Sequence, residues 1–509
     1  MKQQYSTLSL LYVFSILVFE VFYVDNAYFN IMEAKSGMLQ LITAVFLVLF
    51  LGVTVSYAAK DAQGFDRNLK RKLKDFNLVD IAAVALALSS VVSCLFSDNK
   101  SAALLGSRGW GAGAWMYNFL VLLYFFVSRS YSVTPVFVFT MLLSGSIVFI
   151  WSLLNVCSVD FFGMHERIYG GKTAAMAYLA SIGNSNSMAG YASMLIPAVG
   201  ILFIDSKKTV SKIVYGIFLL LGFACCIAAN CDGVYLGLAI GILCMTIFAA
   251  GSLKRIRLLF ASGAIFCASI CLIKLLRLIS GTEKFVDLTG ISAKLCSTNL
   301  AIILLIVFFT IYIALCFAKN ANLARFAAPL RISAAALFIA AVIVVIVYAS
   351  RGFDDNWGSY RGYIWRRSAE MFGELDFKSK LFGIGSDCFG ILFSTDPKAT
   401  LPGAIVLNAH NEWLQYLITT GIIGVAAYAF FWAAPAVDAL FIKKRISAPK
   451  AAMLAGIAGY MGQAVVNNPQ PLCMCILFLF LALYRAQSDS FELADSFELD
   501  TANIPASNN

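Results

Sequence analysis

The chain has 509 residues, of which 60% are hydrophobic and 13% carry a charge, and its formal net charge is +10 at pH 7. Soluble domains average about 25% charged residues, so this composition excludes an ordinary soluble protein and indicates an integral membrane protein. The excess of basic residues indicates membrane topology and not nucleic-acid binding, because these residues gather in short segments between apolar runs.

The apolar runs, of roughly 17 to 25 residues, match helices that cross a ~30 Å hydrocarbon core. They lack the two-residue alternation of membrane barrel strands. The predicted fold is therefore all-α, a polytopic membrane protein with about 12–14 transmembrane helices and a large, partly helical extracytoplasmic loop. The predicted spans, in chain order, are residues 8–24, 38–59, 78–96, 112–127, 135–156, 187–204, 213–229, 234–250, 258–279, 298–318, 332–349, 411–432, 451–467 and 471–484.

These spans divide the chain into four parts. The parts are N-terminal transmembrane helices at 1–349, the large extracytoplasmic loop at 350–410, C-terminal transmembrane helices at 411–485 and a disordered cytoplasmic tail at 486–509. The tail is acidic and repeats Asp-Ser-Phe-Glu-Leu from Asp489 and again from Asp495. Short, polar, biased segments of this kind do not bury enough apolar surface to fold alone.

Lys and Arg are concentrated in alternate connections between the spans. The basic connections contain Lys60 to Lys74, Arg129, Lys207 to Lys212, Lys254 to Arg257, Lys319 to Arg331 and Lys443 to Lys450. The connections at 25–37, 230–233 and 467–470 are nearly free of both residue types. This positive-inside pattern predicts a multi-pass protein of the cell membrane with both termini in the cytoplasm, and it places residues 350–410 outside.

No metal site or cofactor is predicted. Most of the thirteen cysteines lie inside apolar runs, where Cys acts as a small hydrophobic residue. Cys473 and Cys475 have no second pair at zinc-like spacing. Asp354 and Asp355 are adjacent carboxylates of a kind common in solvated loops, so we do not assign a metal to them.

The outside loop has the composition of a folded segment that performs chemistry. Its seven basic residues are balanced by seven acidic ones, so any functional arginine must act individually and not as part of a basic patch. Apolar side chains recur at helical spacing from Arg361 to Phe372, which predicts a helix there. On this helix Arg361, Trp365 and Ser368 share one face, whereas Arg366 and Glu370 lie elsewhere.

An enzyme outside the membrane has no access to cytoplasmic nucleotide sugars or ATP. It depends on a substrate already carried across, such as a lipid diphosphate-linked sugar. An arginine suits this substrate because its planar fork of donors binds phosphate oxygens and stays charged. A histidine, with an ordinary pKa of about 6.5, is suited to accept a proton from an acceptor hydroxyl.

Five segments of the chain resemble those of the O-antigen ligase and polymerase superfamily. They are Gly183-Asn184-Ser185-Asn186-Ser187-Met188-Ala189, Ser359-Tyr360-Arg361-Gly362-Tyr363-Ile364-Trp365, Leu381-Phe382-Gly383-Ile384-Gly385, Asn408-Ala409-His410-Asn411-Glu412-Trp413-Leu414-Gln415 and Gly421-Ile422-Ile423-Gly424. This resemblance covers about residues 180–430. It implies a membrane glycosyltransferase of cell-envelope polysaccharide biosynthesis that moves glycan from undecaprenyl diphosphate to an acceptor at the outer face.

The resemblance also implies the site residues. Arg361 would engage the donor diphosphate and His410 would act at the reacting groups, both as catalytic residues and without a metal. The residues predicted to bind substrate are Arg351, Asn411, Glu412, Asn184 and Asn186. Many family members have a Ser-Arg pair at a mid-chain span where this chain has Asn230-Cys231-Asp232-Gly233, and Arg351 is the predicted replacement for that arginine.

Each assignment has a structural alternative that the sequence leaves open. His410 could belong to a helix cap, Arg361 could pair with Glu370 or a lipid headgroup, and Arg351 could reach lipid phosphates from the end of a span. Asn184 and Asn186 could cap a helix or form a turn.

The function also has alternatives. The chain could be a polysaccharide or lipid-carrier transporter or flippase, although no internal repeat supports this reading. It could also be a structural or regulatory membrane protein. As an enzyme its partners would be the lipid-linked donor, membrane lipids and an acceptor that is a glycan, a lipid or a wall polymer, and the sequence does not distinguish ligase from polymerase.

Overall fold

The described part of the chain is helical apart from one small sheet. The computed structural model describes residues 2–107, 110–166, 168, 177–318, 328, 329, 332, 333, 336, 354–399, 401, 405–443 and 446–487. In these residues β1 (Tyr178–Leu179) pairs antiparallel with β2 (Gly183–Asn184). The helices, of which η1 and η2 are π-helical, are α1 (Lys2–Phe14), η1 (Ser15–Glu20), α2 (Ile31–Lys60), α3 (Ala62–Lys74), α4 (Leu78–Phe96), α5 (Lys100–Leu105), α6 (Ala114–Ser128), α7 (Pro135–Val156), α9 (Ser185–Asp205), α10 (Thr209–Ala228), α11 (Gly233–Ala249), α12 (Leu253–Ser280), α13 (Gly290–Ser297), α14 (Leu300–Phe317), α16 (Trp357–Glu374), α17 (Phe377–Phe382), α18 (Phe389–Thr395), α19 (Glu412–Val437), η2 (Asp438–Lys443), α20 (Ala448–Ala464) and α21 (Pro471–Ala486).

The predicted all-α polytopic membrane fold is confirmed. In the described chain eight helices are long and apolar enough to cross a membrane, against about 12–14 predicted, and three shorter apolar helices accompany them. Each predicted span coincides with a helix, except the one at 332–349, most of which lies outside the described residues. The order of helices along the chain therefore follows directly from hydropathy and length.

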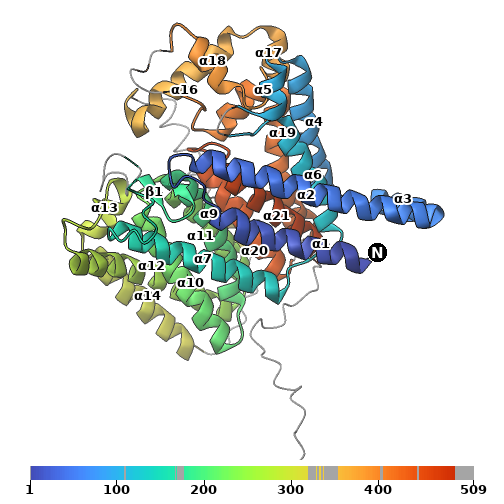
Figure 1. Ribbon diagram of the computed structural model, residues 1–509. Helices are drawn as coiled ribbons and strands as arrows, with labels where there is room; N and C mark the ends of the chain where they lie inside the picture. The colour runs from blue at the N-terminus through green and yellow to red at the C-terminus, as the bar shows by residue number, and fades with distance from the viewer. Residues whose placement is uncertain are drawn as a thin grey trace, which may run out of the picture.

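Helix α9 lies at the centre of the helical bundle. Its apolar stretch is entirely buried inside the protein, whereas that of α14 is almost entirely exposed and so is suited to face lipid. In Figure 1, α9 lies with α11, α20 and α21 in the middle of the molecule, and α12 and α14 lie to one side. The N-terminal end of α9, which carries Asn184 to Asn186, is thereby held between several helices.

The described part of the segment 350–410 is folded onto one end of the bundle. Helices α16, α17 and α18 lie together above α19 and beside α4 and α5 (Figure 1). They share a small apolar core that includes Ile364, Met371 and Phe389, together with Ile418 of α19. The helix predicted from Arg361 to Phe372 is confirmed as part of α16.

A break in α19 ties the loop to the bundle. Gly421 has φ +72°, which interrupts the helix and leaves carbonyls of the preceding turn free to accept hydrogen bonds. The N–H of Ile384 donates to the Ile418 carbonyl at 3.2 Å, and that of Gly385 donates to the Thr419 carbonyl at 3.0 Å. A Cβ on Gly383 or Gly421 would collide with the opposite backbone. These glycines allow two backbones to approach closely, which explains two of the recognised motifs.

Replacing Gly421 with alanine is expected to lower the free energy of unfolding by about 2 kcal/mol or more, because alanine is strained at this φ and meets the Leu381 carbonyl. Thermal unfolding of the purified protein in detergent measures the change. Gly373→Ala is the matched control, because an added Cβ there meets no atom within 4 Å. Equal melting temperatures for the two variants would show that the break in α19 is not needed for stability.

Candidate functional site

Asn186, in the first turn of α9, connects four parts of the chain. Its backbone N–H donates to Oδ1 of Asn184 at 2.8 Å, so Asn184 caps the helix, as one sequence alternative proposed. Its own Oδ1 accepts from Nη2 of Arg361 and from Sγ of Cys231, both at 3.2 Å. Its carbonyl accepts from Nδ2 of Asn467 at 3.0 Å. The predicted residues Asn186 and Arg361, 175 positions apart, are therefore in direct contact.

Arg361 begins the regular part of α16 after a sharp turn. Gly358, Ser359 and Tyr360 all have positive φ, which non-glycine residues adopt at an energetic cost. The turn directs Arg361 towards α9, where its side chain is largely buried and its pKa is lowered by burial. Within the described chain Arg361 donates one hydrogen bond, to Asn186. Most of the five N–H donors of its guanidinium group therefore remain available.

The other arginines of α16 are held by carboxylates. Arg366 pairs with Asp355 at 2.8 Å, and Arg367, which is buried, pairs with Asp396 at 2.6 Å. Glu370 pairs with both arginines at 2.9 Å, so it is not the partner of Arg361 that one sequence alternative suggested. The balanced charges of the loop thus form an internal network. Within the described residues Arg361 has no carboxylate at ion-pair distance.

His410 lies in a strained and tightly held turn before α19. Its φ is +48°, and its N–H donates to Oδ1 of Asn408 at 3.2 Å. The carbonyl of Ala409 accepts from Nε1 of Trp365 at 3.0 Å, which joins this turn to α16. Asn411, and not His410, caps α19 by accepting from the N–H of Leu414 at 3.1 Å. Capping gives Asn411 a structural role, but it gives none to His410.

The imidazole of His410 is largely buried, and its Nδ1 has no hydrogen-bonding partner within the described chain. Burial and, as the smaller cause, the positive charge of Arg361 together lower the pKa of His410 to about 4. The ring is therefore neutral at pH 7 and carries one nitrogen lone pair. Arg361 and His410 lie close enough for the charge of one to affect the protonation of the other.

Glu412 points into the helical bundle. It is 3% exposed, and its two carboxylate oxygens accept from the hydroxyls of Tyr428 and Tyr460, each at 2.5 Å. These bonds join the start of α19 to α20 two residues after His410. They give Glu412 a structural role in holding the His410 turn, and its predicted substrate-binding role remains a prediction. Arg351 lies outside the described residues.

The mid-chain tetrad contributes one side chain to the site. Cys231 contacts Asn186 and is close enough to Arg361 for their charges to interact. Asn230 and Asp232 face the neighbouring connection instead, where they accept from the N–H groups of Thr289 and Ile291. The tetrad thus places a thiol beside Arg361.

Asp387 is a further buried group near the site that the sequence did not single out. Its Oδ2 accepts from the N–H groups of Ser107 at 2.6 Å and Ala112 at 3.2 Å. Burial raises its pKa to about 7, although these two bonds oppose the shift. It lines a cavity of about 20 Å³ beside Asn408, which is room for about one water molecule. A single Asp in a glycine-rich segment does not predict burial, so the sequence alone does not identify this residue.

The arrangement combines an anion-binding group with a neutral base. Arg361 offers donors and a positive charge, His410 offers a lone pair, and Asn184 and Asn186 fix the helix end on which Arg361 rests. In the described chain no cluster of three or more His, Cys, Asp or Glu side chains is placed to hold a metal ion. No protein-family model matches the chain, and a search of curated proteins found no similar sequence.

Proposed function

We propose that this multi-pass membrane protein is a glycosyltransferase that resembles O-antigen ligases and polymerases. It would move glycan from undecaprenyl diphosphate to an acceptor at the outer face of the cell membrane, in cell-surface polysaccharide synthesis. The main support is that Arg361 and His410, from distant parts of the chain, come together in one buried site with Asn186. Arg361 has unused donors in this site, and His410 has an unused nitrogen.

In the proposed reaction a hydroxyl of the acceptor attacks the anomeric carbon of the donor sugar. The new C–O bond forms as the bond between that carbon and the diphosphate oxygen breaks, and the lipid diphosphate leaves with the electron pair. The hydroxyl proton goes to the lone pair of His410. Arg361 stabilises the charge that develops on the leaving diphosphate. Attack from the face opposite the leaving group inverts the anomeric centre.

The electrostatic coupling between the two residues suits this order of events. In the free protein the charge of Arg361 helps to keep His410 neutral. A bound diphosphate would offset that charge and so raise the pKa of His410, although burial, the larger cause of its low pKa, would remain. The imidazole would then become a stronger base when the donor is in place, which ties proton transfer to donor binding.

The rival hypothesis is a transporter or flippase. Proteins of that class have their polar binding groups near the membrane midplane. Here the candidate residues gather at the end of the bundle that carries the loop predicted to lie outside. The decisive experiment reconstitutes the purified protein into liposomes with a lipid diphosphate-linked oligosaccharide and an acceptor glycan. Formation of a longer or newly attached glycan supports the proposal, whereas movement of the donor between leaflets without a new glycosidic bond supports the transporter.

A further inference from the structure

Helix α3 has one apolar face and one basic face. Phe65, Leu69 and Leu73 recur every four residues and so lie on one side of the helix. The opposite side carries four exposed basic side chains, those of Arg67, Lys70, Arg71 and Lys74. In all, the thirteen residues of α3 include five basic ones and a single acidic one, Asp66. Asp66 pairs with Lys70 at 2.7 Å, and most of the positive charge is left uncompensated.

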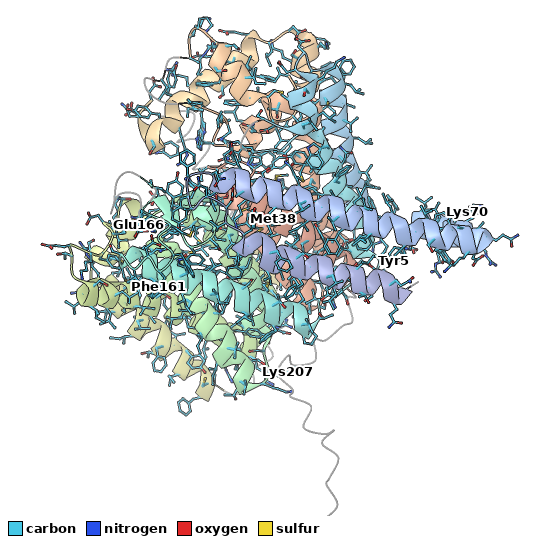
Figure 2. All side chains as sticks on the ribbon, viewed as in Figure 1. Tyr5, Met38, Lys70, Phe161, Glu166 and Lys207 are labelled. Carbon is cyan, nitrogen blue, oxygen red and sulfur yellow. The ribbon has the colours of Figure 1, made fainter. Side chains whose placement is uncertain are left out.

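The helix is held at the end of α2, at the edge of the molecule. Nδ2 of Asn68 donates to the hydroxyl of Tyr57 at 3.0 Å, and the ring of Phe65 lies 6.1 Å from that of Tyr57. These contacts fix α3 against the last turns of α2. Figure 2 shows Lys70 at the far end of this projection, pointing away from the rest of the protein. The basic face is therefore accessible to a partner.

The end of the last helix, α21, lies beside the residue that follows α3. Arg485, near the end of α21, donates from Nη2 to the carbonyl of Asp75, the residue that follows α3, at 2.6 Å. Its Nε pairs with Asp80 at 3.1 Å, which fixes this contact. Residues 488–509 follow, within three positions, a side chain that contacts the residue after α3. They contain no Lys or Arg, and their five acidic residues are Asp489, Glu492, Asp495, Glu498 and Asp500.

We propose that residues 489–500 bind to the basic face of α3 in the same molecule. The chain from residue 487 to residue 500 spans up to about 43 Å when extended, and α3 is about 20 Å long, so the acidic segment reaches the whole basic face. A tether of this length gives an effective concentration in the millimolar range. Single exposed ion pairs are weak, so binding depends on several carboxylates acting together and is sensitive to salt.

A photoreactive benzoylphenylalanine at Gln63 tests the proposal without removing a charge, because Gln63 is exposed on the basic face of α3. The full chain is placed in nanodiscs of zwitterionic phospholipid, irradiated, digested and analysed by mass spectrometry. The expected product joins Gln63 to a peptide from residues 488–509. Its yield should fall about fivefold or more in 1 M NaCl, where the Debye length is about 3 Å.

The controls separate the tail from other partners of α3. The same photoreactive residue at Leu69, on the apolar face, should link to lipid and not to the tail. Neutralising the tail with Asp489→Asn, Glu492→Gln, Asp495→Asn, Glu498→Gln and Asp500→Asn should abolish the Gln63 product. Lipid adducts alone at Gln63 would overturn the proposal. Links between light and heavy chains in an isotope-mixed sample, in place of links within one chain, would overturn it as well.

Discussion

His410→Gln is expected to lower the rate of glycan transfer by about 10²–10⁴-fold, because the substitution removes the proposed proton acceptor and keeps a polar side chain of similar size. The assay is single-turnover transfer from a lipid diphosphate-linked donor by the purified variant. Protein yield and melting temperature are measured in parallel, since His410 lies in a strained turn. Binding of the donor should change far less than the rate.

The chain provides a matched control for this substitution in its second histidine. His165 is held by Asp160 and the Tyr178 carbonyl and is not among the proposed catalytic residues, so His165→Gln should retain transfer. In the unsubstituted protein kcat/KM should stay constant as the pH falls through 6.5 and should decline only near pH 4, where free His410 becomes protonated. Full activity in His410→Gln would remove this residue from the mechanism.

Arg361→Lys is expected to reduce transfer by about 10²–10³-fold, because an ammonium group keeps the charge but loses the planar fork that binds phosphate oxygens. Loss of the guanidinium group also weakens the hydrogen bond to Asn186. Transfer is measured as before, and donor affinity is measured separately by titration with undecaprenyl diphosphate. Both quantities should decline, since the arginine would touch the donor before and during the reaction.

Arg366→Lys is the control for this second prediction. Arg366 lies on the same helix, is half-exposed and is paired with Asp355 and Glu370. Its substitution should leave transfer within a few-fold of normal. Similar losses in the two variants would mean that α16 tolerates no change and that Arg361 has no special role. Normal transfer in Arg361→Lys would separate this residue from the diphosphate.

The membrane helices could be predicted because each is specified by its own sequence. A run of about 20 apolar residues has few options in a bilayer, where every backbone group must be bonded within its helix. The helix beginning near Arg361 was predictable for a similar reason, since its apolar spacing is local. The faces of that helix also follow from spacing, and Trp365 and Ser368 are indeed turned inward whereas Arg366 is exposed.

The contacts of the site were not predictable in this way, because they depend on which helices become neighbours. The resemblance predicts that Asn186 and Arg361 belong to one site, but the sequence around Asn186 does not indicate that it would bond directly to Arg361 and Cys231. The inward direction of Glu412 depends on Tyr428, sixteen residues along α19, and on Tyr460 of α20. The burial of Asp387 likewise depends on the connection between α5 and α6.

The position of Asn186 has a consequence for how the protein is made. Its partners Arg361 and Asn467 come 175 and 281 residues later in the chain. Since synthesis proceeds from the N-terminus at about 5–20 residues per second, α9 is in the membrane well before either partner leaves the ribosome. Until these partners are made, Asn186 lacks its contacts with Arg361 and Asn467. The contact with Asn467 is the last of these to form, after α20 has been made, so an unfinished chain lacks the complete set of contacts around Asn186.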